Sequence, residues 1–277
     1  MFPIFGIIGE GLKAGFGFAR AYPWHVVAIY GVSLTMACIG ASGVIRLPLP
    51  LWLSGLLITW LLTVFTALIL APVWTALYRF AVLGDRSRSI REFDKRTLRV
   101  AMVMLVLAFV SLLGAVPFAL GLDILPLIGA RRLVFFGAIS FAALVKLGGF
   151  WLNARLAIAP AMAAAGAKPQ ALDTAFAYTR WASIPVLATF FIIYVPHLTI
   201  SAALIAMPSM LDIRPGSPPA IGLFAVNILL STVLSATTDL VWGGVIGRLA
   251  LKLVKVQRAR AAEAARRARD GRDDDDD

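Results

Sequence analysis

The sequence predicts an all-α protein, a polytopic membrane helical bundle of six transmembrane helices with interfacial amphipathic helices on the cytoplasmic side. The first observation is composition: 60% of the 277 residues are hydrophobic, 15% are charged, and the mean hydropathy is +0.86. Soluble domains are about 45–50% apolar and about 25% charged, so an ordinary soluble enzyme and a disordered chain are excluded. The second is the presence of six long apolar runs. The third is the concentration of Lys and Arg between alternate runs.

Residues 1–22 are predicted to form an amphipathic helix that lies on the membrane. Glycines, Glu10 and Lys13 interrupt its apolar residues, and no small-residue cleavage site follows, so a secretory signal is not indicated. Gly11 and Gly15 form a GxxxG pattern, which favours close packing on a neighbouring helix.

Six apolar runs then follow, each longer than the roughly 20 residues that cross about 30 Å of hydrocarbon. Pro72 lies inside the second run and predicts a kink, because proline cannot donate a helical hydrogen bond. The predicted spans are residues 24–45, 51–78, 100–121, 133–157, 181–207 and 220–247.

The basic residues predict the orientation. Of the 26 Lys and Arg residues, 21 fall on the side of the two termini, four fall on the other side, and Lys146 lies within a span. The positive-inside rule therefore places both termini in the cytoplasm, as an even number of spans requires. The resulting domains are an interfacial helix (1–22), a six-helix transmembrane domain (23–247) and a basic cytoplasmic helix ending in a disordered acidic tail (248–277).

The connections on the cytoplasmic side are predicted to be partly helical. Ser89 could cap a helix that begins at Ile90, with Glu92 completing a capping box. After Pro169, residues 171–180 read as a second short amphipathic helix.

A few polar residues fall within the spans and form a candidate intramembrane polar cluster. Asn227, Ser231, Ser235, Asp239, Gly243 and Gly247 recur every four residues along one ridge of the sixth span, a pattern typical of close helix packing in lipid. The fourth span carries Lys146 and Asn153 on one face and Arg155 near its end. The candidate cluster is Lys146, Asn153, Arg155, Ser235 and Asp239.

Similar depth in the membrane predicts that Asp239 pairs with Arg155, or with Lys146, and fastens spans four and six together. A polar cavity for a small solute, ion or lipid head group is the second interpretation, and charged side chains that reach the membrane surface without a partner are the third.

Candidate catalytic and metal-binding residues are not found. His25 and His197 are far apart and fit packing or interfacial positions better than a metal pair. Nucleophile-elbow, zinc-protease, phosphate-loop and dinucleotide-binding motifs are missing. Cys38 is the single cysteine, which excludes an internal disulfide. We therefore predict a protein that is not an enzyme and that has no catalytic, cofactor-binding or metal-binding residues and no cofactor.

The C-terminal tail predicts a partner. Residues 248–269 hold eight basic residues and one acidic residue, Glu263, and six aspartates follow in residues 270–277. Basic residues beside a membrane attract anionic lipid, so the expected partners are the bilayer and anionic lipid at the cytoplasmic face. Nucleic acid is not expected, because the segment lacks interleaved aromatic residues.

Two segments carry a resemblance to known proteins. A span ends in residues 150–161 (FWLNARLAIAPA), and residues 171–180 (ALDTAFAYTR) precede the next span; Tyr78-Arg79-Phe80 and Leu83-Gly84-Asp85 add a second match. The chain resembles uncharacterised bacterial inner-membrane proteins and is similar to the six-helix membrane domain found with some glycerophosphoryl diester phosphodiesterases. The resemblance implies a multi-pass protein of the bacterial plasma (inner) membrane, with Arg155 and Pro160 forming a structural corner. It does not imply phosphodiesterase activity, because the soluble catalytic domain is missing.

These observations favour a non-enzymatic scaffold or accessory protein that could engage lipid. The alternative is a small transporter or permease-like subunit with a polar cavity between spans four and six; an intramembrane enzyme is the least favoured. A packed face between these spans would support the scaffold, and a cavity that reaches Lys146 and Asp239 would support the transporter.

Overall fold

The computed structural model describes residues 4–42, 44–45, 47–49, 51–85, 94–124, 132–166, 171–180, 182–210 and 218–273. Within these residues every regular element is an α-helix, as predicted. In chain order the helices are α1 (Ile4–Ala21), α2 (Pro23–Ser42), α3 (Leu51–Ile69), α4 (Ala71–Leu83), α5 (Lys95–Ile124), α6 (Arg132–Leu156), α7 (Ala159–Ala164), α8 (Ala171–Thr179), α9 (Ser183–Met210) and α10 (Pro218–Asp273).

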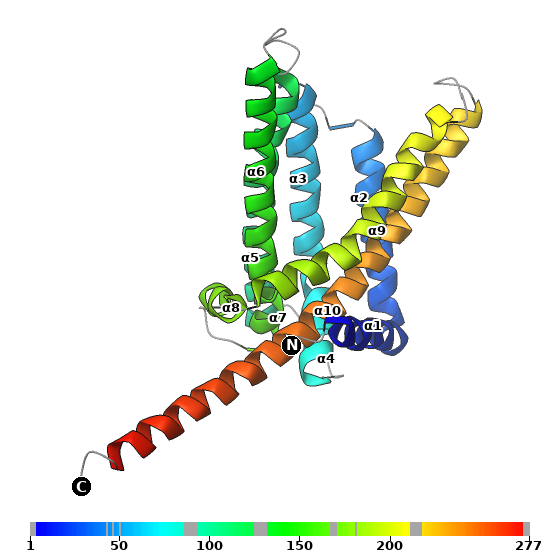
Figure 1. Ribbon diagram of the computed structural model, residues 1–277. Helices are drawn as coiled ribbons and strands as arrows, with labels where there is room; N and C mark the ends of the chain where they lie inside the picture. The colour runs from blue at the N-terminus through cyan, green and yellow to red at the C-terminus, as the bar shows by residue number, and fades with distance from the viewer. Residues whose placement is uncertain are drawn as a thin grey trace.

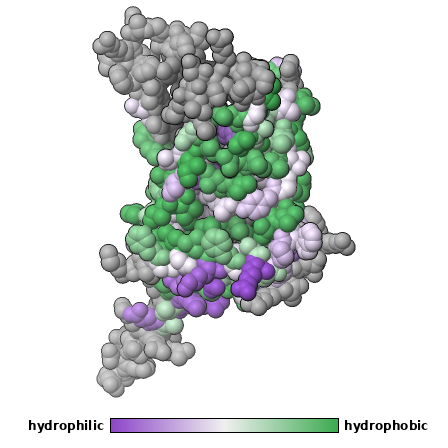
Figure 2. All heavy atoms as spheres, turned by 90° about the vertical axis from the view of Figure 1, so that its right-hand side faces the viewer, coloured by the Kyte–Doolittle hydropathy of each residue, from purple (hydrophilic) through white to green (hydrophobic). Residues whose placement is uncertain are grey.

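In the described part of the chain, four helices are long and apolar enough to cross a membrane: α2, α5, α9 and α10. The bent pair α3 and α4 passes the same test together and raises the number to five. The predicted count of six is not confirmed, because α6 has 25 residues but is not among the helices that pass. The chain is compatible with a multi-pass membrane protein, and Figure 2 shows a broad hydrophobic belt above a hydrophilic band.

The long helices form two groups that diverge toward the upper end of the molecule in Figure 1. α5 packs on α3 and α6, whereas α10 packs on α2 and α9. At the lower end α10 contacts α1, α4 and α7, and α5 also contacts α4 and α7. Fully buried side chains gather in this lower layer, among them Phe18, Leu77, Ile158 and Leu249. The lower layer therefore joins the two groups.

The second predicted span is broken into two helices. α3 and α4 meet at a 61° bend, with Leu70 between them. Pro72 lies in the first turn of α4, where its missing N–H removes no helical hydrogen bond. The kink predicted at Pro72 is confirmed. α4 ends at Leu83 and is capped by Gly84, whose φ of 69° is a left-handed conformation that glycine adopts without a Cβ penalty.

Helices α1 and α10 cross at a contact made by glycines. Gly11 lies against the backbone of Val245, and Gly244 lies against the backbone of Gly11 and Gly15. A Cβ atom built on Gly11 would lie 2.5 Å from the Cα of Val245, so no side chain fits there. The close packing predicted from the GxxxG pattern is confirmed.

A neighbouring face of α10 also packs closely. Cβ atoms built on Gly243 and Gly247 would overlap Leu77 and Ala81 of α4. Gly243 and Gly247, two of the small residues predicted to lie on one ridge of the sixth span, are therefore packed where the helix meets α4.

The short helices agree in part with the predictions. α8 (Ala171–Thr179) is the predicted second amphipathic helix, and α1 is the predicted N-terminal helix; their placement at the membrane surface stays a prediction. The predicted cap at Ser89 lies outside the described residues. In the described part, Asp94 caps α5: its Oδ1 accepts hydrogen bonds from the backbone N–H of Arg96 (3.0 Å) and of Thr97 (2.8 Å).

The chain turns sharply after α6. Arg155 and Pro160 are both buried at the turn between α6 and α7, where the resemblance implies a corner. At the C-terminus α10 continues as one helix to Asp273, so it extends past residue 248 and into the aspartates predicted to be disordered. Residues 274–277 lie outside the described residues.

Candidate functional site

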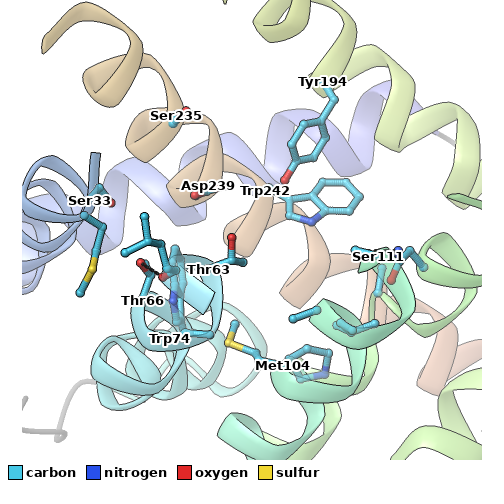
Figure 3. Close-up of a pocket in the computed structure, with 18 of the residues that line it drawn as sticks. Ser33, Thr63, Thr66, Trp74, Met104, Ser111, Tyr194, Ser235, Asp239 and Trp242 are labelled. Atoms are coloured by element: carbon cyan, nitrogen blue, oxygen red, sulfur yellow. Dashed lines mark hydrogen bonds between the residues drawn. The ribbon is translucent and has the colours of Figure 1, made fainter. Parts of the chain in front are cut away.

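A cavity of about 790 Å³ lies between the two groups of helices. The described residues that line it come from eight helices: α2, α9 and α10 on one side, α3, α5 and α6 on the other, and α4 and α7 at the lower end. Figure 3 shows the side chains that face it. The volume falls within the range of about 300–1,000 Å³ typical of small-molecule sites.

Asp239 of α10 is the one charged residue among the described residues that line this cavity. Its side chain is half-buried, and the phenol of Tyr194 from α9 faces it and interacts with it (Figure 3). Among the described residues Asp239 forms no ion pair; the two pairs seen are Arg79–Asp85 and Lys252–Glu10. The cavity therefore contains a carboxylate without a described counter-charge.

The predicted pairing of Asp239 with Arg155 is wrong. The guanidinium of Arg155 lies 3.5 Å from the centre of the Phe176 ring and 5.0 Å from that of Trp151, and its Nη2 donates a hydrogen bond to the Phe176 carbonyl (2.5 Å). Arg155 thus turns toward α8, away from the cavity. The two positions have similar depth along their helices, but they face in different directions.

The alternative partner, Lys146, has a side chain outside the described part of the structure. Its pairing with Asp239 therefore stays a prediction. The described packing of α6 is against α5, α8 and α9, and the cavity separates α6 from the part of α10 that carries Asp239.

Three of the five predicted cluster residues share the cavity. Asn153 and Ser235 line it together with Asp239. The Nδ2 of Asn153 donates a hydrogen bond to Oγ of Ser111 (3.0 Å), which links α6 to α5 on the cavity wall. Asn153 of α6 and both Ser235 and Asp239 of α10 therefore line the same space, as the cavity interpretation predicts.

Aromatic side chains form the wall beside Asp239. The rings of Phe190 and Tyr194 are stacked with centroids 4.4 Å apart. The indole of Trp242 meets both edge-on, at 5.4 Å from Phe190 and 5.5 Å from Tyr194. Trp74 of α4 also lines the cavity. Faces of aromatic rings attract cations, so this wall complements the carboxylate.

The sequence reasoning missed these aromatic residues and a stripe of hydroxyl groups. Thr59, Thr63 and Thr66 of α3 line the cavity, and each donates its hydroxyl to a carbonyl of its own helix at 2.8 Å. Their spacing of four and three residues places them on one helical face. That spacing is a signal that could have identified α3 as part of the wall.

The histidines have packing roles in the structure. His25 is buried and lies edge-on to the rings of Phe18 and Tyr22. Nδ1 of His197 lies 3.3 Å from the hydroxyl of Thr238. Within the described residues, no three His, Cys, Asp or Glu side chains gather as a metal site would need.

Comparisons with protein-family models, with curated proteins and with solved structures find no match. The resemblance to the six-helix membrane domain, carried by residues 150–161 and 171–180, therefore stays a prediction.

Proposed function

We propose that this protein is a small membrane carrier that binds an amphiphilic cation in the cavity at Asp239. The single observation that supports this most strongly is a carboxylate in a large, mostly apolar cavity, with no described counter-charge. The carrier was the second interpretation of the sequence, and the cavity favours it over the scaffold.

Placing the carboxylate of Asp239 within a membrane costs free energy, so we expect this residue to have a function. A carboxylate near the centre of a bilayer costs roughly 2.5–3.5 kcal/mol on insertion scales, and such residues mark ion or substrate pathways by default. The carboxylate can be neutralised by a proton or by a cation that enters the cavity. An ion pair with Arg155 would have given Asp239 a structural role, but Arg155 interacts with Phe176.

The lining defines the chemistry of the ligand. A cationic head group would lie between the Asp239 carboxylate and the rings of Tyr194 and Trp242, where the ion pair and the ring faces both favour positive charge. Apolar residues of the other helices, such as Leu62 and Met104, would contact a hydrophobic body. An amine or onium ion with a bulky apolar part fits both requirements.

The arrangement of helices supports movement of the ligand rather than simple storage. The two groups diverge toward the upper end of the molecule and are joined at its lower end by α1, α4 and α7 (Figure 1). Rocking of one helix group against another around a central site is a common transport mechanism. The joined end would serve as the hinge.

The membrane and the orientation belong to the same proposal. The segregation of 21 basic residues to one side supports cytoplasmic termini. The resemblance of residues 150–161 and 171–180 supports a bacterial inner membrane. We assign no catalytic residue and no cofactor to the protein.

Equilibrium dialysis of the purified full chain in detergent against radiolabelled tetraphenylphosphonium tests the proposal. We expect saturable binding by the natural chain and at least tenfold weaker binding by Asp239→Asn, which keeps the shape and removes the charge. Glu10→Gln is the matched control, since it removes one negative charge at an exposed ion pair outside the cavity. Equal binding by a folded Asp239→Asn variant and by the natural chain would overturn the proposal.

A transport assay follows from the same variants. In proteoliposomes the natural chain and Glu10→Gln are expected to accelerate uptake of the same cation over empty vesicles, whereas Asp239→Asn is not. Saturable binding without accelerated uptake would limit the function to binding and reject the carrier.

A further inference from the structure

A second pocket, of about 640 Å³, lies where α8 meets the end of α6 and the lower part of α10. It is separate from the Asp239 cavity and shares no lining residue with it. Its wall contains the side chains of Arg155, Asp173, Phe176, Tyr178, Arg180 and Gln257. Figure 1 places α8 at the lower end of α6, on the side of the molecule to which the C-terminal part of α10 extends.

Arg155 is held rigidly in this pocket. Only 7% of the residue is exposed. Its guanidinium lies against the Phe176 ring at 3.5 Å, and the Thr179 hydroxyl donates a hydrogen bond to its backbone carbonyl (2.9 Å). A fixed guanidinium loses little conformational entropy when it binds an anion.

The guanidinium of Arg155 also lacks partners that its burial would require. Its Nε is buried without a hydrogen-bond partner. Asp173 lines the same pocket, yet it forms no ion pair with Arg155 in the described structure. A buried charge without a counter-charge is costly. The missing partner is therefore an anion with hydrogen-bond acceptors.

A second positive charge faces the same space. Arg180 lines the pocket and is close enough to Arg155 for the two charges to repel each other. Two guanidinium groups that approach one another are favourable when an oxyanion lies between them, because each can donate two parallel hydrogen bonds to it. The amide of Gln257 and the phenol of Tyr178 add neutral hydrogen-bond donors to the wall.

We propose that this pocket binds a phosphate group between Arg155 and Arg180. The positive charge of the two arginines, the fixed guanidinium of Arg155 and its unpartnered Nε all favour such a ligand. A phosphate can come from the head group of an anionic lipid or from free phosphate in solution. Trp151 and Phe176 are partly exposed beside the guanidinium, and aromatic residues of this kind are enriched at the membrane–water boundary.

Binding by the purified full chain in detergent, measured by microscale thermophoresis, separates the sources. One arm uses short-chain phosphatidylglycerol, a second uses phosphatidylcholine of the same chain length, and a third uses inorganic phosphate. Tighter binding of phosphatidylglycerol than of the other two assigns the pocket to an anionic lipid head group. Comparable binding of inorganic phosphate assigns it to free phosphate as well.

Two variants test the location. Arg180→Gln removes an exposed pocket charge, and Gln257→Glu adds a negative charge to the wall. We expect each to weaken binding about tenfold, as the loss of one charge-assisted contact predicts. The matched control is Arg258→Gln, because Arg258 is an exposed neighbour on α10 that does not line the pocket. It is expected to change affinity less than twofold.

Two results would reject the proposed phosphate site. If Arg180→Gln and Arg258→Gln weaken binding equally, the attraction is general to the basic surface and the proposed site is rejected. Binding of neither phosphatidylglycerol nor phosphate by a chain that still binds tetraphenylphosphonium also rejects it. This second result leaves the carrier proposal intact, since the two pockets have no residue in common.

Discussion

Substituting alanine for Gly11 tests whether the crossing of α1 and α10 depends on contact between backbones. A Cβ atom at Gly11 would lie 2.5 Å from the Cα and 2.8 Å from the backbone N of Val245. Carbon atoms in favourable contact are about 3.5–4.0 Å apart, so the helices must separate by roughly 1 Å. Backbone atoms cannot rotate away as a flexible side chain can, and the buried Ile7 and Phe18 of α1 would lose contacts.

Gly9→Ala is the matched control on the same helix. A Cβ atom at Gly9 meets nothing within 4 Å. Both alanines raise helix propensity by about 0.8–1.0 kcal/mol relative to glycine, so this gain cancels when the two variants are compared. Overpacking costs about 1–3 kcal/mol. We expect the packing of α1 on α10 to be weaker in the Gly11→Ala variant than in the Gly9→Ala variant, by about 1–3 kcal/mol.

Hydrogen exchange of the α1 backbone amides, followed by mass spectrometry in detergent, measures this difference. In the regime where exchange reports the opening equilibrium, a difference of about 1–3 kcal/mol corresponds to exchange faster by roughly five- to 150-fold in Gly11→Ala. Exchange that is equal in the two variants, or slower in Gly11→Ala, would refute the reasoning. Amides of α6, which is distant from this contact, should exchange at the same rate in both chains.

Two hydrogen bonds give further predictions. The buried hydroxyl of Thr179 lies 2.9 Å from the Arg155 carbonyl oxygen, so Thr179→Val is expected to lower the free energy of unfolding by about 1–3 kcal/mol in an SDS titration. A loss below about 0.5 kcal/mol would contradict the proposed support of the Arg155 corner. Asn153→Ala removes the bond to Ser111 between α6 and α5, for which about 0.6 kcal/mol is expected, as is common for hydrogen bonds between membrane helices. Ser111→Ala should add little in the Asn153→Ala background, and a fully additive double mutant would show that the two side chains do not interact.

The long apolar helices of the chain could be predicted because they depend on local composition. Hydrophobic runs long enough to cross a bilayer appear directly in the sequence, and a proline such as Pro72 removes a helical hydrogen bond wherever it lies. The close packing of the helix that contains Gly11 and Gly15 could be predicted for a similar reason, since only small residues permit helices to approach so closely. The number of spans was harder to predict. The bent helices α3 and α4 pass the test for a span only as a pair, and α6 is not among the helices that pass.

The partners of the polar residues could not be predicted in the same way. Sequence position gives the depth of Arg155 and Asp239 along their helices, but it does not give the rotation of one helix relative to the other. The guanidinium of Arg155 contacts the ring and the carbonyl of Phe176 in α8. Both groups lie nearer to it than any carboxylate in the described structure. Tyr194, which faces Asp239, comes from α9, and only the packing of α9 on α10 brings it there.

Helix α10 connects the two proposed sites and also keeps them apart. Asp239 and Gln257 are 18 residues apart on this continuous helix, about 27 Å at 1.5 Å per residue. Between them, Gly244 is fixed by the backbone of α1, and Gly243 and Gly247 are fixed by α4. Such contacts do not allow the helix to slide without separating backbones. The clamped segment can therefore act as a fixed point, with the helices around the Asp239 cavity moving above it while the phosphate pocket holds its place below.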